Sequence, residues 1–283
     1  MTDFGLTEID HLVWSVRDAE AAGQNFERLG FVVSPISRMS GIGVENRLVL
    51  FSPQGAGCAN FLEAMAMYGA NTHPAMKHIL SKPECVRWVV LTSSDATRSL
   101  EALRPEGIDF GAVMPVERDW TLPSGEVLKP AFRVTLPVDG ALPFNFLTYN
   151  NLEPYLRPAW FDHPNGARMM TDVLVAGDGA PAAQALAEKL INKQAQAVSS
   201  GVYALKAGAV GFVFMSSSAA VQRYGAALED ESPSGLFGCR IQVGDRGRIC
   251  EVLSRNGVRF YDKGERIVVP AKEANGGLIE FHL

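Results

Sequence analysis

A pattern that recurs four times along the 283-residue chain limits the folds that the chain can adopt. Each copy begins with a run rich in β-forming residues that ends in an aspartate, namely Asp18, Asp95, Asp178 and Asp245. A helical pattern follows each aspartate. Aspartate suits the position before a helix because its carboxylate accepts backbone N–H groups of the first turn. A repeat of this kind indicates a chain built from similar structural units.

The helical patterns and the runs after them define the unit. Helices are predicted over residues 19–29, 96–103, 180–190 and 246–254. Three copies have a glycine twelve residues after the aspartate (Gly30, Gly107 and Gly257), where a helix end favours left-handed backbone. Three further β-like runs follow each helix: 31–34, 46–51 and 60–67; 110–116, 130–136 and 143–149; 196–200, 203–207 and 209–216; 258–261, 266–271 and 277–282. The unit is therefore βαβββ, with a helix on one face of a curved mixed sheet and the other face free to enclose a ligand.

The linker between the second and third copies predicts two domains. Residues 150–166 contain Pro154, Pro158, Pro164 and the turn signal Asn165-Gly166. We expect an N-terminal domain over residues 1–155 and a C-terminal domain over residues 164–283, each made of two units. The predicted fold class is α+β, with four βαβββ modules paired into two cup-shaped domains.

Composition narrows the class of partner. The net charge is −5 and no dense basic run is present, which disfavours nucleic acid as the main partner. The four cysteines form no Cys-x-x-Cys pair, no basic and apolar leader opens the chain, and no uncharged apolar run approaches the ~20 residues of a membrane span. We expect a cytoplasmic protein that binds a small molecule. Whether the chain forms a homodimer is left open.

His11 and Glu63 are the residues of the first unit that indicate chemistry. His11 lies in the first strand and Glu63 in the last, within the apolar run Phe61-Leu62-Glu63-Ala64-Met65. A glutamate in such a strand is costly to bury without a partner. If both side chains face the concave side of the sheet, they can meet there, and histidine with glutamate is a common donor pair for a divalent metal.

The first two units resemble a known superfamily. Residues 9–13 (Ile-Asp-His-Leu-Val), 29–31 (Leu-Gly-Phe), 41–46 (Gly-Ile-Gly-Val-Glu-Asn) and 61–63 (Phe-Leu-Glu) are similar to the opening module of glyoxalase-like domains, and residues 118–125, 142–144 and 163–167 continue the pattern. These domains belong to the vicinal oxygen chelate superfamily, which includes glyoxalase I, bleomycin-resistance proteins and extradiol dioxygenases. The resemblance implies paired modules that form a cup, often around a divalent metal such as Zn, Ni, Mn or Fe.

The superfamily places one ligand on the first strand of each module and one on the last. His11 and Glu63 match both positions in the first module. The other modules place these residues there: Trp88 and Thr148, Thr171 and Phe214, Gly238 and Glu280. A metal at His11 and Glu63 would therefore need a third ligand, for which His163 in the linker is the candidate. Ring-cleaving dioxygenase activity is not expected, because only Glu280 of its C-terminal ligand set is present.

The ligand cavity is predicted in the first cup. Strand alternation gives an apolar lining that includes Phe61, Trp88, Phe146 and Thr148. Two polar residues are added as substrate-binding candidates. Arg118 can bind a carboxylate, or pair with Asp119 at the surface, and Asn46 can donate to a ligand, or close a turn.

Two functions remain open. The first is a glyoxalase-like enzyme, of lyase or isomerase type, that acts on a small oxygenated or carboxylated molecule in the N-terminal cup. There His11 and Glu63 would hold a metal or move a proton. The alternative is a non-catalytic protein that binds or sequesters a small molecule, as bleomycin-resistance proteins do, with His11 and Glu63 as a metal-free hydrogen-bonded pair.

Overall fold

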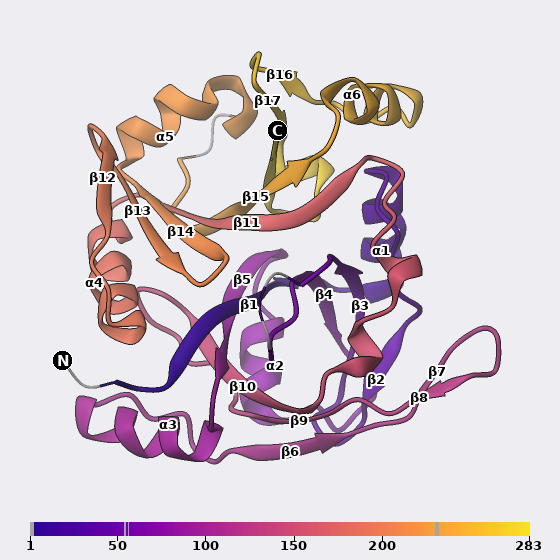
Figure 1. Cartoon of the computed structure of the whole chain (residues 1–283), viewed down its shortest axis with the longest axis vertical. Helices are drawn as coiled ribbons and strands as arrows, with labels where there is room; N and C mark the ends of the chain where they lie inside the picture. The colour runs from indigo at the N-terminus through magenta and orange to yellow at the C-terminus, as the bar shows by residue number, and fades with distance from the viewer. Residues whose placement is uncertain (1–2, 54, 56, 230–231) are drawn as a thin grey trace.

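Two curved eight-stranded sheets, one from each half of the chain, form the frame of the molecule (Figure 1). The computed structural model describes residues 3–53, 55, 57–229 and 232–283. In spatial order, the first sheet contains β2 (Ser37–Met39), β3 (Val44–Leu50), β4 (Phe61–Met67), β1 (Leu6–Ser15), β5 (Cys85–Ser93), β10 (Phe144–Asn151), β9 (Ala131–Val134) and β6 (Met114–Glu117). The second contains β12 (Gln196–Ser199), β13 (Val202–Ala207), β14 (Val210–Met215), β11 (Ala167–Ala176), β15 (Gly235–Val243), β18 (Leu278–His282), β17 (Arg266–Val269) and β16 (Tyr261–Asp262).

The modules pair through their first strands. In the first sheet, β1 lies parallel to β4 of its own module and antiparallel to β5 of the next. In the second sheet, β11 lies between β14 and β15 in the same way. The prediction of an α+β fold, with four βαβββ modules paired into two cups, is confirmed.

The helices begin and end where the repeat predicts. The four module helices are α1 (Ala19–Arg28), α3 (Ala96–Leu103), α4 (Ala180–Ile191) and α6 (Arg246–Arg255). Asp18, Asp95 and Asp245 each accept two backbone N–H groups of the following helix. The third copy differs, because Gly179 rather than Asp178 stands at the start of α4 and Asn192 takes the left-handed position at its end. Asn can do so because its short polar side chain tolerates this conformation.

Several elements differ from expectation. Residues 31–34 form no strand, since Val32 N donates to His163 and Pro35 interrupts pairing. The hairpin of β7 (Trp120–Thr121) and β8 (Val127–Leu128) projects from the body, as Figure 1 shows. Two further helices, α2 (Pro74–Leu80) and α5 (Ser217–Tyr224), follow the last strands of the first and third modules. Short 3-10 turns cover Arg104–Glu106, Glu153–Tyr155, Pro158–Trp160, Gly225–Leu228 and Ala271–Glu273.

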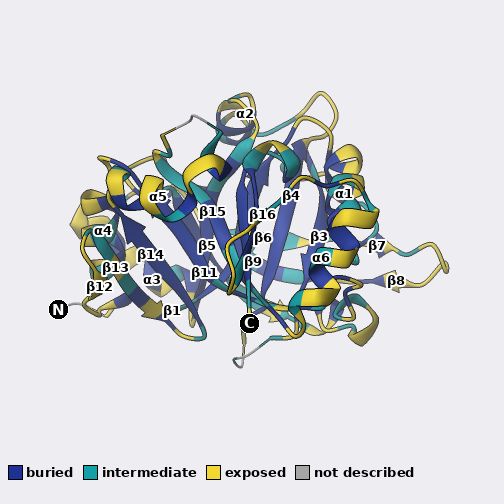
Figure 2. Ribbon diagram, turned by 90° about the horizontal axis from the view of Figure 1, so that it is seen from above, coloured by how far each residue is buried: buried dark blue, intermediate teal, exposed yellow. Residues whose placement is uncertain are grey.

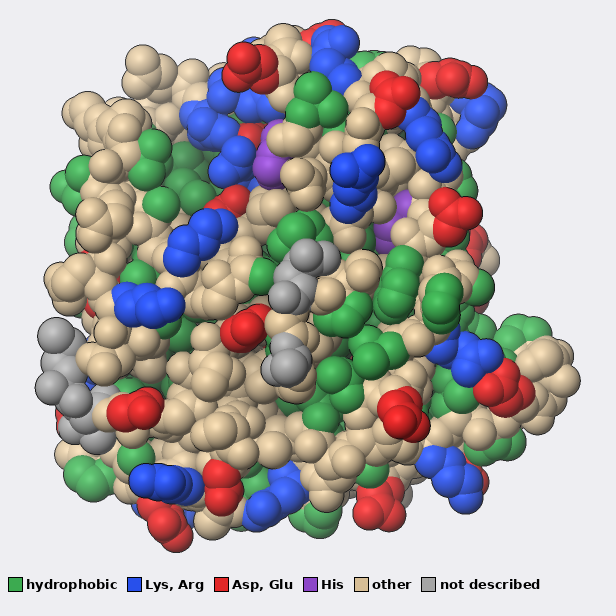
Figure 3. Space-filling model, in the orientation of Figure 1, with side chains coloured by type: hydrophobic (Ala, Val, Ile, Leu, Met, Phe, Trp, Pro, Cys, Tyr) green, Lys and Arg blue, Asp and Glu red, His purple; other side chains and the backbone are tan. Residues whose placement is uncertain are grey.

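The side chains of each sheet divide between a shared core and a cup. Residues such as Leu12 and Trp14 of β1 join one large core that also contains Val173 and Phe281 of the second sheet. Residues on the opposite faces line the two concave sides as separate clusters. Figure 2 shows the buried strands between the exposed helices. On the face drawn in Figure 3, acidic and basic side chains are interspersed.

Asn60 connects the two sheets and gives a test of their packing. Its Nδ2 donates to Met170 O at 3.0 Å, and its Oδ1 accepts from Met170 N at 2.9 Å. Asn60→Leu leaves both backbone groups of Met170 buried and unpaired, so we expect the free energy of unfolding to fall by at least about 2 kcal/mol. Urea unfolding measures this loss. The exposed Asn150→Leu is the control, and an equal effect of both changes would contradict the role of Asn60.

Candidate functional site

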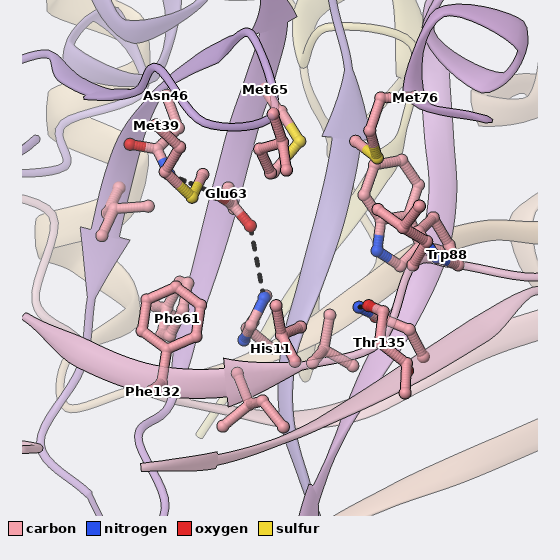
Figure 4. A pocket seen from close by; sticks show the side chains of 18 of the residues that line it. His11, Met39, Asn46, Phe61, Glu63, Met65, Met76, Trp88, Phe132 and Thr135 are labelled. Atoms are coloured by element: carbon pink, nitrogen blue, oxygen red, sulfur yellow. Dashed lines mark hydrogen bonds and ion pairs between the residues drawn. The ribbon is translucent and has the colours of Figure 1, made fainter. Parts of the chain in front are cut away.

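The concave side of the first sheet holds a cavity. Most of its lining is apolar, and a few polar side chains converge in it, as is usual for small-molecule sites. The lining residues that matter below are His11, Met39, Asn46, Phe61, Glu63, Met65, Met76, Trp88, Arg118, Phe132, Thr135, Asn145, Tyr149 and Tyr155 (Figure 4).

His11 lies between two carboxylates. Its Nδ1 is 2.6 Å from Asp10 Oδ1, and its Nε2 is 3.2 Å from Glu63 Oε2. None of the three side chains is more than about 6% exposed. In a regular strand, Asp10 and His11 would point to opposite faces. In β1, however, Ile9 pairs with Leu91 and His11 with Val90 of β5, so Asp10 is the extra residue of a bulge. The bulge allows neighbouring side chains to hydrogen-bond each other.

Hydrogen bonds compensate the burial of Asp10. Its Oδ2 accepts from Ala59 N at 2.9 Å and from Thr92 Oγ1 at 3.1 Å. Its Oδ1 accepts from Tyr149 OH at 2.8 Å as well as from His11. Burial and the Asp10 charge raise the pKa of Tyr149 well above its usual value, so the phenol stays a donor. Asp10 is therefore a fixed anion behind the imidazole ring.

Glu63 is oriented from two sides. Its Oε1 accepts from Asn46 Nδ2, and its Oε2 faces His11 Nε2 (Figure 4). The His11 ring stacks on Phe61 with a centroid distance of 4.0 Å, which fixes the plane of the imidazole. The carboxylate of Glu63 thus has a defined position at the cavity wall.

The charge of His11 follows from these contacts. Burial lowers the pKa of His11, but its hydrogen bonds to Asp10 and Glu63 and their negative charges outweigh burial and raise the pKa to about 9. At neutral pH the ring is therefore an imidazolium that donates to both carboxylates. The three side chains together carry one net negative charge.

The raised pKa of His11 predicts how stability depends on pH. Because the folded-state pKa lies above the ordinary value of 6.5, this contribution to stability is fully present below pH 6.5 and is lost as the pH rises through 9. We expect the free energy of unfolding to fall over this interval by up to roughly 3 kcal/mol. Urea unfolding at several pH values measures it, with His11→Gln as the reference. Parallel profiles of the two proteins would contradict the charged state.

The structure brings together only part of the predicted site. His11, Glu63, Asn46, Phe61, Trp88 and Arg118 all line the cavity. Phe146 and Thr148 do not, which corrects the predicted lining. Phe146 belongs to the shared core, while Thr148 Oγ1 donates to Ser93 O and accepts from Ala96 N at the start of α3. Their neighbours in β10, Asn145, Leu147 and Tyr149, face the cavity instead.

His163 does not reach the cup, and its prediction as a third metal ligand is wrong. Its Nδ1 accepts from Val32 N and its Nε2 bonds to Leu50 O, both at 3.0 Å. Burial lowers the pKa of His163 to about 4, so the ring is neutral. It lies between Phe31 and Phe51 and serves the packing of the linker.

Five polar residues of the site were not predicted from the sequence: Asp10, Thr135, Asn145, Tyr149 and Tyr155. The position of Asp10 beside His11 is a signal in the sequence, but no sequence pattern reveals the bulge. Tyr155 stacks on Phe61 and closes the cavity from the linker.

Arg118 supplies a second positive charge at the cavity. Its Nη2 donates to Tyr155 OH at 3.3 Å, and its guanidinium lies 5.7 Å from the centre of the Trp120 ring. Asp119, the neighbour that was its alternative partner, lies 3.9 Å from Lys129 instead. Within the described part of the chain, Arg118 has no carboxylate partner, and its buried Nε has no hydrogen bond. This guanidinium can receive an anionic group of a ligand.

The donor set in the cup does not fit a resident metal. A bound zinc ion takes three or four protein ligands, and among the described residues only His11 and Glu63 converge here. Among the described residues, no group of three or more His, Cys, Asp or Glu side chains is placed to hold a metal. A metal at His11 Nε2 also requires loss of the proton that Asp10 and Glu63 stabilise.

The second cup is closed by its own helix. The α5 residues Ala220 and Tyr224 pack into the concave side of the second sheet. Glu280, at the position that corresponds to Glu63, is fully buried and binds Arg223 at 2.6 Å and Arg240 at 3.0 Å. Burial raises the pKa of Glu280, but the two guanidinium groups outweigh it and lower the pKa. Among the described residues, the neighbouring His282 forms a hydrogen bond with Thr171 and none with Glu280.

A model of a known protein family matches the part of the chain that forms the first cup. The family model described as a glyoxalase-like domain matches residues 9–191. The chain belongs to the glyoxalase-like domain family. The match covers the first two modules of this glyoxalase-like protein, including His11 and Glu63, and extends to the end of α4. No curated protein matches the chain.

Solved structures share the fold at low sequence identity. A hypothetical protein from Staphylococcus aureus has a TM-score of 0.66 at 10% identity, over 97% of this chain and 98% of its own. A variant of 4-hydroxymandelate synthase from Streptomyces coelicolor has a TM-score of 0.60 at 12% identity, over 98% and 92%. Both are similar in fold over the whole length. No described helix of this glyoxalase-like protein has the length and apolar character needed to cross a membrane.

Proposed function

We propose that the N-terminal cup of this glyoxalase-like protein binds a small oxygenated or carboxylated molecule and that Glu63 moves a proton on it without a metal. One observation supports this most strongly. A carboxylate that faces an apolar cavity is fixed by Asn46 on one side and by a protonated His11 on the other. A carboxylate held in one orientation at the wall of a cavity meets the geometric requirement for a general base.

The residues around Glu63 take separate roles. Glu63 removes a proton from a carbon next to a carbonyl group, and the electron pair of that C–H bond moves to the carbonyl oxygen. Arg118, which has no carboxylate partner in the described chain, binds the carboxylate of the substrate or stabilises the enolate. Asp10 holds His11 in its charged form and is a positioning residue. Return of the proton to the other face or to a neighbouring atom gives an isomer, and departure of a group gives a lyase product.

Proton exchange in deuterated water tests this function. The protein is incubated with 2-oxo and 2-hydroxy carboxylic acids and their esters, and NMR follows the signal of the proton next to the carbonyl. We expect catalysed exchange or conversion of at least one compound. Ligand binding without exchange or conversion would contradict the enzyme function.

A non-catalytic binding protein is the second candidate. The apolar lining with Met39, Met65, Met76, Trp88 and Phe132 favours it, because such a lining holds a hydrophobic compound without any reaction. In that case His11 and Glu63 are a hydrogen-bonded pair that shapes the wall. Stoichiometric binding that does not depend on the charge of Glu63 would identify this function.

A further inference from the structure

Three methionines form one end of the cavity. Met39, Met65 and Met76 are each no more than 6% exposed, and all three line the cavity. They pack with Trp88 in one apolar cluster. Methionine is unbranched and polarizable, so it adapts its shape to an apolar group that packs against it. This methionine end of the cavity is therefore suited to a flexible apolar part of a ligand.

Glu63 separates the methionine end from the opposite end. Phe61, Glu63 and Met65 take successive positions on the cavity face of β4, each about 7 Å from the next along the strand. Figure 4 shows Met65 and Met76 on one side of the Glu63 side chain and Phe61 and Phe132 on the other. A ligand that spans the cavity therefore passes Glu63 between its two ends.

Arg118 lies at the end opposite to the methionines. Its guanidinium is 5.8 Å from the centre of the Phe132 ring, and its Nη2 donates to Tyr155 OH. The Tyr155 ring in turn stacks on Phe61 with a centroid distance of 6.0 Å. The described residues that line the methionine end carry no charge. A positive charge at one end and an apolar surface at the other favour a ligand with an anionic head and an apolar tail.

We propose that the substrate of the N-terminal cup is a 2-oxo carboxylic acid with a flexible alkyl tail of several carbons. This inference rests on the proposed function, since it specifies the substrate on which Glu63 acts. In such a compound the carboxylate, the carbonyl group with its neighbouring C–H bond, and the tail follow one another. The cavity presents Arg118, Glu63 and the methionines in the same order. Each CH2 group that the tail buries among the methionines should strengthen binding roughly fourfold.

A series of 2-oxo acids of increasing length tests the proposal. Pyruvate, 2-oxopentanoate and 2-oxooctanoate share the head and differ only in the length of the alkyl chain. Ligand-detected NMR titrations in deuterated water measure their dissociation constants, and the same spectra report exchange of the proton next to the carbonyl group. We expect 2-oxooctanoate to bind the wild type at least roughly 100-fold more tightly than pyruvate does, with 2-oxopentanoate between them.

Met65→Gln tests where the tail binds. Glutamine has nearly the length and flexibility of methionine, but its amide loses contact with water when an alkyl chain packs against it. The advantage of 2-oxooctanoate over pyruvate should therefore fall roughly fivefold or more in this variant. Met67→Gln is the matched control and should keep the wild-type ratio. Met67 lies in the same strand, is 41% exposed and is not among the described residues that line the cavity.

The outcomes separate this inference from the proposed function. Equal affinities for pyruvate and 2-oxooctanoate, no binding of 2-oxooctanoate, or an undiminished ratio in Met65→Gln would overturn the alkyl tail. Proton exchange on pyruvate would still support Glu63 as the base in each case. Conversely, binding that tightens with chain length, without exchange of any compound, would contradict the proton transfer and leave the tail in place. If Met65→Gln does not fold, Met39→Gln replaces it, because Met39 lies in the short edge strand β2 and lines the same end of the cavity.

Discussion

Replacement of His11 by alanine is expected to lower the free energy of unfolding by roughly 3–5 kcal/mol. The imidazolium stands between Asp10 and Glu63, which are both buried. Its loss leaves two carboxylates facing a small void without the charge that separates them, and removal of one member of a buried ion network is strongly destabilising. Urea unfolding at pH 5.5 measures the loss, because the stabilisation by His11 is complete below pH 6.5.

His78→Ala is the matched control for His11. Its side chain is 69% exposed and lies 3.5 Å from Asp139 at the surface, so its loss should change stability by less than about 0.5 kcal/mol. If the free energy of unfolding falls by less than about 1 kcal/mol in His11→Ala, burial of the Asp10 and Glu63 carboxylates does not depend on the His11 ring.

Replacement of Glu63 by glutamine is expected to reduce catalysed proton exchange by roughly 100- to 10,000-fold. Glutamine has the same shape and still accepts one hydrogen bond, but its amide cannot take up a proton. Ligand affinity should change only by a few-fold, since the cavity wall is preserved. NMR exchange rates and binding measured on the same preparation separate the two effects.

Glu101→Gln, on the exposed side of α3, is the control for Glu63 and should exchange at the wild-type rate. If Glu63→Gln retains full exchange, another group is the base. If it loses ligand binding along with exchange, Glu63 serves recognition rather than proton transfer.

The fold could be predicted because its signals are local and repeated. Asp18, Asp95 and Asp245 satisfy the first N–H groups of their helices, and Gly30, Gly107 and Gly257 all have positive φ after the helix ends. These requirements depend on a few neighbouring residues, so they appear in the sequence wherever the module recurs.

The site could be predicted only where strand alternation is regular. His11 and Glu63 meet as expected, because β1 pairs with β4 in a regular register and the bulge of β1 lies against β5. The predicted lining from β10 took the wrong face of that strand. Phe146 and Thr148 were expected to face the cavity, whereas Asn145, Leu147 and Tyr149 do, because neighbouring residues of a strand point to opposite sides of the sheet.

Features that depend on distant segments were not visible in the sequence. The bulge at Asp10 arises from the pairing of β1 with β5, more than seventy residues later in the chain. His163 is held by Val32 and Leu50, which only the fold brings to the linker. The closing of the second cup by Arg223 and Glu280 likewise depends on how α5 packs.

The protonation state of His11 decides whether Glu63 can act as proposed, since a charged ring between Asp10 and Glu63 leaves the Glu63 carboxylate as the base and leaves His11 without a lone pair for a metal. Nitrogen-15 NMR of the histidine rings at pH 7.5, assigned with His11→Gln and recorded with and without added zinc, measures it. We predict that both nitrogens of His11 are protonated, that the ring titrates near pH 9, and that zinc does not change its signals. A neutral ring at pH 7.5, or signals that shift with zinc, would contradict the account.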